Sequence, residues 1–282
     1  MSGSADLDAR LFVRQPLSSM ESTLLSYLAE EDANIFTIRD VEDHLGKPYN
    51  NAKVIANRLV KKRWAIRLGG GKYLVVPLEA GVKAEYTEHE FIIASHLVEP
   101  YYIAFWSALN YHGLTEQIPH TVFVATTRRL GNRRILDTNY RFITLGGKKF
   151  FGYQPESIGN AKVNVSDAEK TIADCLDHPE YCGGLDEVVK AIRGGQDMVS
   201  TEKLVTYGLR MGNSTILKRL GFLTEYLGIG HTKELINSIL TETKKGYSLL
   251  DPTEKRGGRY LARWGLQINV SENRLREWGK QV

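Results

Sequence analysis

The spacing of hydrophobic and polar residues near the start of the chain predicts three helices followed by a β-hairpin. Apolar residues recur every three or four positions over 18–30, 38–45 and 48–62, the period of a helix with one buried face. Two short apolar runs, Trp64–Leu68 and Tyr73–Pro77, flank a glycine-rich turn and predict paired strands. The order helix, helix, helix, hairpin is typical of a winged helix-turn-helix.

Polar residues mark where these helices begin. Ser18 with Glu21 has the spacing of a capping box, and Thr37 with Asp40 is a weaker version of it. Pro48 suits the first turn of the third helix, where its missing N–H costs nothing. The second and third helices therefore form the predicted helix-turn-helix, and the hairpin forms the wing.

A polar segment from Leu78 to Tyr86 predicts a boundary between a DNA-binding domain over 1–80 and a second domain over 87–282. Ser166 and Glu169 fit a capping box for a helix that ends near Asp177, and a helical pattern continues to about Lys244. We therefore expect an α+β protein whose larger C-terminal domain is mixed α/β, with a helical C-terminal half. The strand candidates are Thr121–Thr127, Tyr140–Leu145, Ala161–Val165 and Leu266–Val270.

The charge distribution is uneven although the net charge is only +4. Eight cations and no Asp or Glu lie between Lys47 and Pro77, whereas six acidic residues and one cation lie between Glu30 and Asp43. A local field of one sign attracts an oppositely charged partner more than the total charge does. The stretch 47–77 therefore favours a polyanion such as DNA.

The third helix carries its polar residues opposite its apolar stripe, as a recognition helix requires. We expect Asn50, Asn51, Lys53 and Asn57 to contact base edges, because Asn pairs with adenine and Lys reaches guanine in the major groove. Phosphates would be held by the hydroxyl of Tyr49 and by the remaining cations of the helix and wing. The predicted DNA-binding residues are Tyr49, Asn50, Asn51, Lys53, Asn57, Arg58, Lys61, Lys62, Arg67 and Lys72.

Two further basic clusters lie in the second domain. Arg128, Arg129, Arg133 and Arg134 surround Gly131 and Asn132 just after a predicted strand. A solvated loop and a contact with nucleic acid or a partner are equally compatible with this cluster. A looser cluster consists of Lys255, Arg256, Arg259 and Arg263. Such clusters could hold flanking DNA or help two monomers to bind side by side.

Three segments follow the winged helix in a specific order: Trp106–Pro119, Ser166–Leu176 and Lys218–Gly228. Together with the N-terminal domain they resemble the AbiEi antitoxins of abortive-infection, type IV toxin–antitoxin systems. The resemblance implies a transcriptional repressor that regulates its own operon through inverted repeats. We expect the chain to be a monomer or weak dimer that assembles on the DNA. It also implies a nucleotidyltransferase-like toxin encoded alongside, which the antitoxin opposes without a tight protein complex.

Most residues of these three segments are expected to have structural roles. Glu169 is explained by its capping box, and Arg219 could form an ion pair with Glu225.

No catalytic residue is assigned, so the chain is expected not to be an enzyme. An enzyme remains the alternative: a nuclease or nucleotidyltransferase-like second domain that the winged helix targets to nucleic acid. A scaffold whose winged helix binds protein is a third reading.

Several motifs for cofactors or metals are absent or incomplete. Gly69–Lys72 is not a phosphate-binding loop, because Tyr73 stands where Ser or Thr would bind magnesium. Gly3 and Ser4 with Asp6 and Asp8 resemble a nucleotidyltransferase metal site but lack a preceding strand. Cys175 and Cys182 are too isolated for a redox motif. We expect no cofactor, no metal, no membrane span and a cytoplasmic location.

Overall fold

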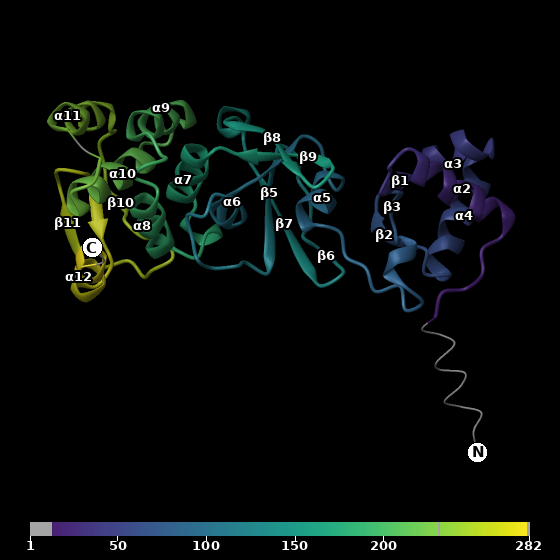
Figure 1. Cartoon of the computed structure of the whole chain (residues 1–282). Coiled ribbons are helices and arrows are strands. Elements are labelled where there is room, and N and C mark those ends of the chain that lie inside the picture. Colours follow the sequence, from purple (N-terminus) through teal and green to yellow (C-terminus); the bar gives the residue numbers. More distant parts are fainter. Residues whose placement is uncertain (1–12, 231, 281–282) are drawn as a thin grey trace, which may run out of the picture. The chain divides into compact units, whose positions relative to one another are not determined.

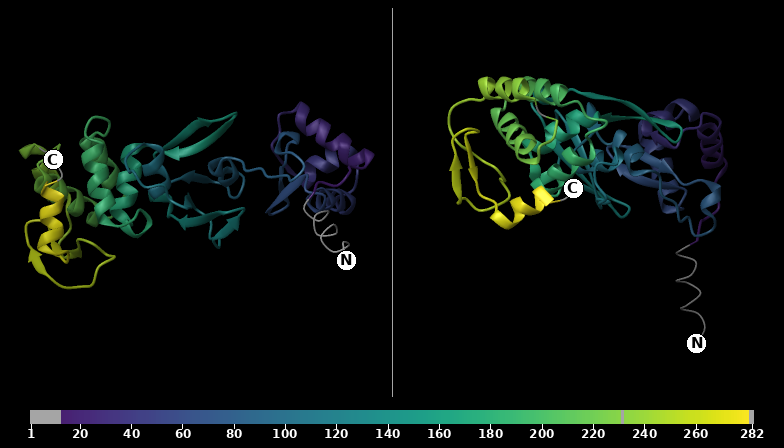
Figure 2. Two further views of the ribbon diagram at one scale, coloured as in Figure 1. Left: turned by 60° about the horizontal axis from the view of Figure 1, so that its bottom comes forward. Right: turned by 60° about the vertical axis from the view of Figure 1, so that its left-hand side comes forward.

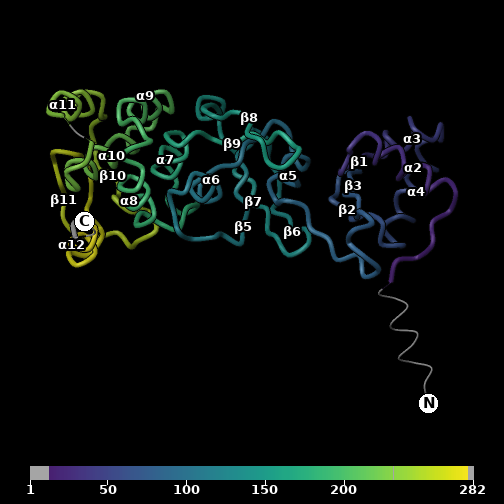
Figure 3. Tube along the Cα trace, in the orientation of Figure 1, coloured from purple at the N-terminus to yellow at the C-terminus, as the bar shows by residue number. Residues whose placement is uncertain are grey.

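The computed structural model describes residues 13–230 and 232–280, which form a mixed α+β protein of two compact units (Figure 1). The first unit extends to His89 and the second begins at Glu90. This division lies a few residues beyond the polar segment 78–86 that separates the predicted domains. Each unit has a hydrophobic core of its own, and Figure 3 follows the chain from one unit into the other. Gly3, Ser4, Asp6 and Asp8 lie outside the described residues.

The first unit contains the three helices that the sequence predicts. Both capping boxes form, because the backbone N–H of Glu21 donates to Ser18 Oγ and that of Asp40 donates to Thr37 Oγ1. Pro48 stands one residue before the third helix, as its N-cap in extended conformation, and not in the first turn. The helices are α2 (Ser19–Glu30), α3 (Ile38–Leu45) and α4 (Tyr49–Lys61).

A three-stranded antiparallel sheet completes the first unit, with strand order β1-β3-β2. The predicted hairpin forms from β2 (Ala65–Gly69) and β3 (Lys72–Val75), and Gly70 in its turn has φ +61°, a backbone region that favours glycine. β1 (Ile35–Thr37) is absent from the prediction, because three residues are too few to show an alternating pattern. The rings of Phe36 and Tyr73 stack at 5.3 Å in the core beneath the sheet.

The second unit is built on a six-stranded mixed sheet with strand order β6-β7-β5-β4-β9-β8. Its inner pairs β5–β7 and β4–β9 are parallel, and the remaining pairs are antiparallel. Three strands match the predicted candidates, whereas β4, β6 and β8 are new. The strands are β4 (Tyr101–Ile103), β5 (Thr121–Thr126), β6 (Arg133–Ile135), β7 (Thr138–Thr144), β8 (Tyr153–Ile158) and β9 (Ala161–Ser166).

Helices and a small sheet follow along the chain, as Figure 2 shows in green and yellow. The sheet order is β10-β12-β11, with β10 (Ser248–Leu249), β11 (Arg259–Leu261) and β12 (Leu266–Ile268). Its central strand β12 corresponds to the predicted strand 266–270. The helices of the unit are α5 (Glu90–Ser95), α6 (Phe105–Tyr111), α7 (Ala168–Asp177), α8 (Leu185–Gly194), α9 (Thr201–Met211), α10 (Ser214–Leu227), α11 (Lys233–Glu242) and α12 (Glu272–Lys280).

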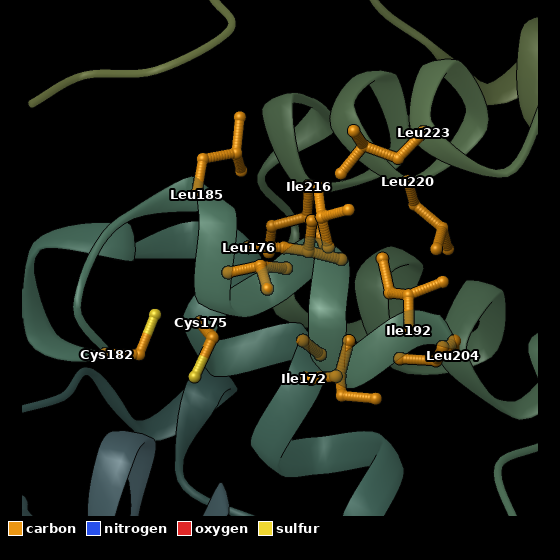
Figure 4. Close-up of a cluster of buried hydrophobic side chains, with 14 of the residues drawn as sticks. Ile172, Cys175, Leu176, Cys182, Leu185, Ile192, Leu204, Ile216, Leu220 and Leu223 are labelled. Carbon is orange, nitrogen blue, oxygen red and sulfur yellow. The ribbon is translucent and has the colours of Figure 1, made fainter. Parts of the chain in front are cut away.

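The helix α7 lies at the centre of the second unit and is buried on nearly every side. Figure 4 shows Ile172 and Leu176 of α7 among side chains from its neighbours, including Ile192 of α8, Leu204 of α9 and Ile216 of α10. Even the polar residues of α7 are largely buried. A helix that is buried all round must satisfy its polar side chains inside the protein.

Lys170 and Asp174 of α7 form a fully buried ion pair. Lys170 Nζ also donates to the hydroxyl of Tyr102 at 3.0 Å, and that hydroxyl donates to Asp174 Oδ2 at 3.0 Å. The ammonium group lies 5.2 Å from the centre of the Phe151 ring as well. The three polar groups therefore satisfy one another within an otherwise apolar core.

The capping box predicted from Ser166 and Glu169 is wrong. Asp167 is the N-cap of α7, and its carboxylate accepts from the backbone N–H of Lys170 at 2.8 Å. Ser166 belongs to β9, and its hydroxyl donates to the carbonyl of Ile103. Glu169 instead accepts from Lys203 Nζ at 2.9 Å, so it connects α7 to α9. Aspartate is as good an N-cap as serine. The sequence alone therefore does not show whether the helix begins after Ser166 or after Asp167.

The predicted ion pair between Arg219 and Glu225 does not form either. Six residues along a helix correspond to about 240° of rotation, so the two side chains point in different directions. Arg219 donates to the carbonyl of Leu249 at 3.1 Å and to that of Leu176 in the last turn of α7. Glu225 accepts from Trp264 Nε1 at 2.7 Å. Both residues therefore fasten α10 to neighbouring segments.

Gly221 lies in the middle of α10 because the indole of Trp264 packs directly against it. A Cβ added at position 221 would come within 2.1 Å of the Trp264 ring. We expect Gly221→Ala to destabilise the second unit by about 2 kcal/mol, although alanine is the better helix former, because overpacking outweighs the gain in helix propensity. Urea unfolding of the variant checks this. Unchanged or increased stability would contradict the packing described.

Candidate nucleic-acid interface

One face of α4 is buried in the first unit and the opposite face is exposed. Ala52, Ile55, Ala56 and Leu59 lie in the core, at the i, i+3, i+4, i+7 spacing that the sequence shows. The exposed face carries polar and cationic side chains with no carboxylate among them. The exposed predicted residues of α4 are Tyr49, Asn50, Asn51, Lys53, Arg58 and Lys61.

The exposed side chains of α4 are available to a ligand. In the part of the chain that the structure describes, Asn50, Lys53 and Lys61 make no side-chain hydrogen bond or ion pair. Val54 is 47% exposed on the same helix and was not among the predicted residues. An exposed aliphatic side chain beside amides and cations matches the thymine methyl group that DNA presents in the major groove.

Asn57 differs from the other predicted base-contacting residues because it is half-buried. Its side-chain oxygen accepts a hydrogen bond from the hydroxyl of Tyr73 at 3.5 Å, and Tyr73 is fully buried. Asn57 therefore joins α4 to β3. Its replacement would change the packing of the helix as well as any base contact, so Asn50 and Lys53 are the cleaner positions for testing recognition.

Lys62, predicted to hold a phosphate, is engaged inside the protein. Its ammonium group forms an ion pair with Glu21 at 2.5 Å, and the Glu21 side chain is buried. Burial by itself raises the pKa of Glu21, but hydrogen bonds from Lys62 and Ser18 outweigh burial and hold the pKa below its ordinary value of 4.5. The pair connects the end of α4 to the start of α2, and we do not count Lys62 among the phosphate contacts.

The lowered pKa of Glu21 makes a prediction about acid stability. A carboxyl whose pKa is depressed by folding stabilises the protein above its unfolded pKa, and the contribution is lost as the pH falls through the folded value. We expect Glu21→Gln to cost about 1–2 kcal/mol at neutral pH, with the difference from wild type shrinking below about pH 4.5. Urea unfolding at several pH values measures this. A difference that stays constant with pH would rule out the ion pair as its cause.

The hairpin places further cations beside α3. Arg67 on β2 is exposed and Lys72 on β3 is half-buried. The backbone N–H of Ile38 donates to the carbonyl of Gly71 at 3.2 Å, which fastens the hairpin turn to the start of α3. Arg39 is the next residue and is exposed. It was not predicted as a site residue because its sequence neighbours are acidic, and only the fold brings it beside the hairpin.

The four arginines of the second cluster lie on the loop after β5 and on β6. Arg128, Arg129 and Arg134 are exposed, whereas Arg133 is half-buried and lies 5.9 Å from the centre of the Phe142 ring. Arg141 of β7 joins the cluster in a surface hollow of about 440 Å³. Sequence reasoning missed Arg141 because it lies within a strand. The hollow is lined by Thr121, Phe123, Asn132, Arg133, Arg134, Asn139, Tyr140 and Arg141.

Over 13–230 and 232–280, no three His, Cys, Asp or Glu side chains are placed to hold a metal ion together. Within the same ranges, no helix combines the length and the apolar character that crossing a bilayer requires.

Comparisons with known proteins give a likeness of fold. The sequence matches no protein-family model and no curated protein. A crystal structure of the Rv2827c protein from Mycobacterium tuberculosis matches the chain with a TM-score of 0.67 at 14% sequence identity. The match covers 96% of this chain and 98% of that one, so the two proteins share their fold over nearly their whole lengths.

Proposed function

We propose that this chain is a sequence-specific DNA-binding repressor that acts as the antitoxin of a type IV toxin–antitoxin system. In this proposal α3 and α4 form a helix-turn-helix and β2 with β3 forms its wing. The chain binds inverted repeats in the promoter of its own operon, as a monomer or weak dimer that assembles on the DNA. The antitoxin role rests on the resemblance of the segments Trp106–Pro119, Ser166–Leu176 and Lys218–Gly228, in this order after the N-terminal domain, to AbiEi antitoxins.

The observation that carries the proposal is the exposed face of α4. Asn50, Asn51 and Lys53 lie on it, in a helix whose other face is fixed in a packed core. Amide and ammonium groups on a rigid helix can read the donor and acceptor pattern of base edges in the major groove. A helix that served only as a solvated surface would need no such concentration of amides.

The charge around that face supports the same conclusion. Arg58 and Lys61 follow on α4, and Arg67 lies on the wing, in a stretch without a carboxylate from Lys47 to Pro77. These groups suit the phosphates on either side of a groove, where cations fix the orientation of a recognition helix. The phosphate contacts would supply most of the affinity, and the amides would supply the sequence preference.

Binding to the promoter tests the proposal. We expect the full chain to bind a duplex from its own promoter more tightly than a scrambled duplex of the same composition. With about four to five phosphates neutralised per monomer, log K should fall against log salt with a slope of roughly −4. Fluorescence anisotropy at several salt concentrations measures both quantities. Equal affinity for the two duplexes, or binding that ignores salt, would contradict the proposal.

The antitoxin role needs a separate experiment. The nucleotidyltransferase-like toxin encoded alongside would be expressed from an unrelated promoter, so that repression of the operon cannot account for any rescue. We expect the chain to restore growth without forming a complex that survives purification with the toxin. Continued growth arrest in the presence of the folded chain would contradict the antitoxin role and leave the DNA-binding proposal intact.

A further inference from the structure

Two tyrosine side chains stand exposed on the small C-terminal sheet. Tyr247 is 54% exposed and Tyr260 is 62% exposed, and their rings contact each other edge to face at 4.8 Å. Single exposed apolar side chains are ordinary on a protein surface, but two aromatic rings in contact form a continuous patch, and such patches mark binding sites. The pair is separate from α4 and belongs to the second unit.

The register of the sheet explains why the rings face outward. Leu266 and Ile268 of β12 are buried, so Gln267 between them lies on the outer face. Tyr260 of β11 is paired with Gln267 and therefore shares that face. Tyr247 directly precedes β10 on the other side of β12. The outer face of the sheet thus carries both rings, while Leu266 and Ile268 on its inner face belong to the core.

Cations lie close to the two tyrosines in the sequence, within the segments that form the sheet. Between 242 and 263 there are six cations and three carboxylates, and two of those carboxylates, Asp251 and Glu254, are held by Arg274. Within the described residues, five exposed cations of this segment have no carboxylate partner. They are Lys244, Lys245, Lys255, Arg256 and Arg259.

The segments that carry these groups are held in place. Lys218 Nζ donates to the carbonyl of Gly246 at 2.6 Å, next to Tyr247. Asn269 Nδ2 donates to the carbonyl of Asp251 at 2.6 Å and to that of Lys255 at 3.3 Å. Gly258 lies so close to β12 that a Cβ there would come within 1.9 Å of the Ile268 carbonyl oxygen. The rings and the basic loop are therefore positioned before any ligand binds.

We propose that the outer face of the C-terminal sheet binds single-stranded nucleic acid. Unpaired bases would stack on Tyr247 and Tyr260, and exposed cations of the same segments would hold the phosphates along the strand. Exposed aromatic rings on a sheet, flanked by cations, bind unpaired bases, because such bases leave a face free for stacking. The bases of a duplex are already stacked on each other, so a duplex cannot use the rings. This activity goes beyond promoter binding and does not depend on α4.

Binding of labelled single strands tests the inference. The probes are oligo(U) and oligo(dT) of about twelve nucleotides, a length within the site sizes of known single-strand binders. We expect the full-length chain to bind one or both, and the double variant Tyr247→Ala/Tyr260→Ala to bind at least about tenfold more weakly. Tighter binding of oligo(U) would identify RNA as the ligand, and tighter binding of oligo(dT) would identify single-stranded DNA.

Matched variants separate stacking from general attraction by charge. Tyr247→Phe/Tyr260→Phe keeps both rings and should bind within about twofold of wild type. Asn50→Ala/Lys53→Ala should leave single-strand binding unchanged, which makes the result independent of promoter binding. Because both tyrosines are exposed, unchanged thermal unfolding will show that the alanine variant is folded. Equal binding by the alanine variant and wild type, no binding by wild type, or full competition by an unlabelled duplex would overturn the inference.

Discussion

The variant Asp174→Ala should lose about 3–5 kcal/mol of stability in the second unit, among the largest losses expected of a single substitution in this chain. The alanine leaves the ammonium of Lys170 buried without its carboxylate, and removal of one partner of a buried pair costs an amount of this order. Burial raises the pKa of the Asp174 carboxyl, and the ammonium of Lys170 opposes that shift. The two charges therefore depend on each other within the core.

Urea unfolding of single and double variants measures that dependence. Lys170→Met/Asp174→Leu removes both charges and should be more stable than Asp174→Ala, because no unpaired charge is then buried. The exposed pair Arg134–Asp137 provides the control, since loss of an exposed ion pair costs at most about 1 kcal/mol, and Asp137→Ala should stay within that range. Additive effects at 170 and 174 would show that the pair is not coupled in solution.

The double variant Asn50→Ala/Lys53→Ala should bind the promoter duplex at least about 100-fold more weakly than wild type. A good base-edge contact contributes about 1–3 kcal/mol, and both side chains are exposed on the face of α4 that we assign to the groove. Because neither residue contributes to the core, thermal stability should be unchanged. The matched control is Lys83→Ala, which removes an exposed cation of the same unit outside α4 and the hairpin.

Anisotropy titrations with promoter and scrambled duplexes measure both the affinity for the promoter and the preference for its sequence. The double variant should lose its preference between the duplexes, whereas Arg58→Ala should weaken binding to both by a similar factor and reduce the salt slope by about one. Wild-type affinity in the double variant would remove α4 from the interface. Equal weakening by Lys83→Ala would show that only the charge of the unit matters.

The first unit could be predicted almost completely from its sequence because its signals are local. The capping residues Ser18 and Thr37 and the apolar spacing of α4 each lie within one helix, and each predicted the element that the structure shows. The pairing of β1 with β3 depends on residues nearly forty positions apart, Phe36 and Tyr73. A pattern within three residues contains no trace of such a partner.

In the second unit, patterns within single segments failed to predict the edge strand β8 and the burial of one ion pair. β8 has mostly polar and partly exposed residues, including Pro155, and it pairs only at the edge of the sheet, so it lacks the apolar run that identified β5. The buried pair Lys170 and Asp174 has the i, i+4 spacing of an ordinary surface ion pair. Its burial follows only from the elements that surround α7, which the sequence of α7 does not contain.

The candidate interface was predictable in its composition but not in the state of each side chain. The sequence placed Asn50 and Lys53 on one face of a helix, and both are exposed there. It gave no sign that Lys62 is paired with Glu21, 41 residues away, or that Asn57 accepts from Tyr73. Arg39 and Arg141 were missed for the related reason that their positions near other cations arise from the fold.

The position of α4 on DNA can be measured directly by cleavage from a tethered iron chelate. Lys53→Cys introduces an exposed attachment point, and a saturating protein concentration offsets the single base contact that the substitution removes. The native thiols Cys175 and Cys182 are buried and should remain unlabelled. We expect the chelate at position 53 to cut the promoter duplex over a few base pairs within each inverted repeat. Protein that binds the promoter but cuts it from Lys83→Cys and not from Lys53→Cys would contradict the assignment of α4 to the groove.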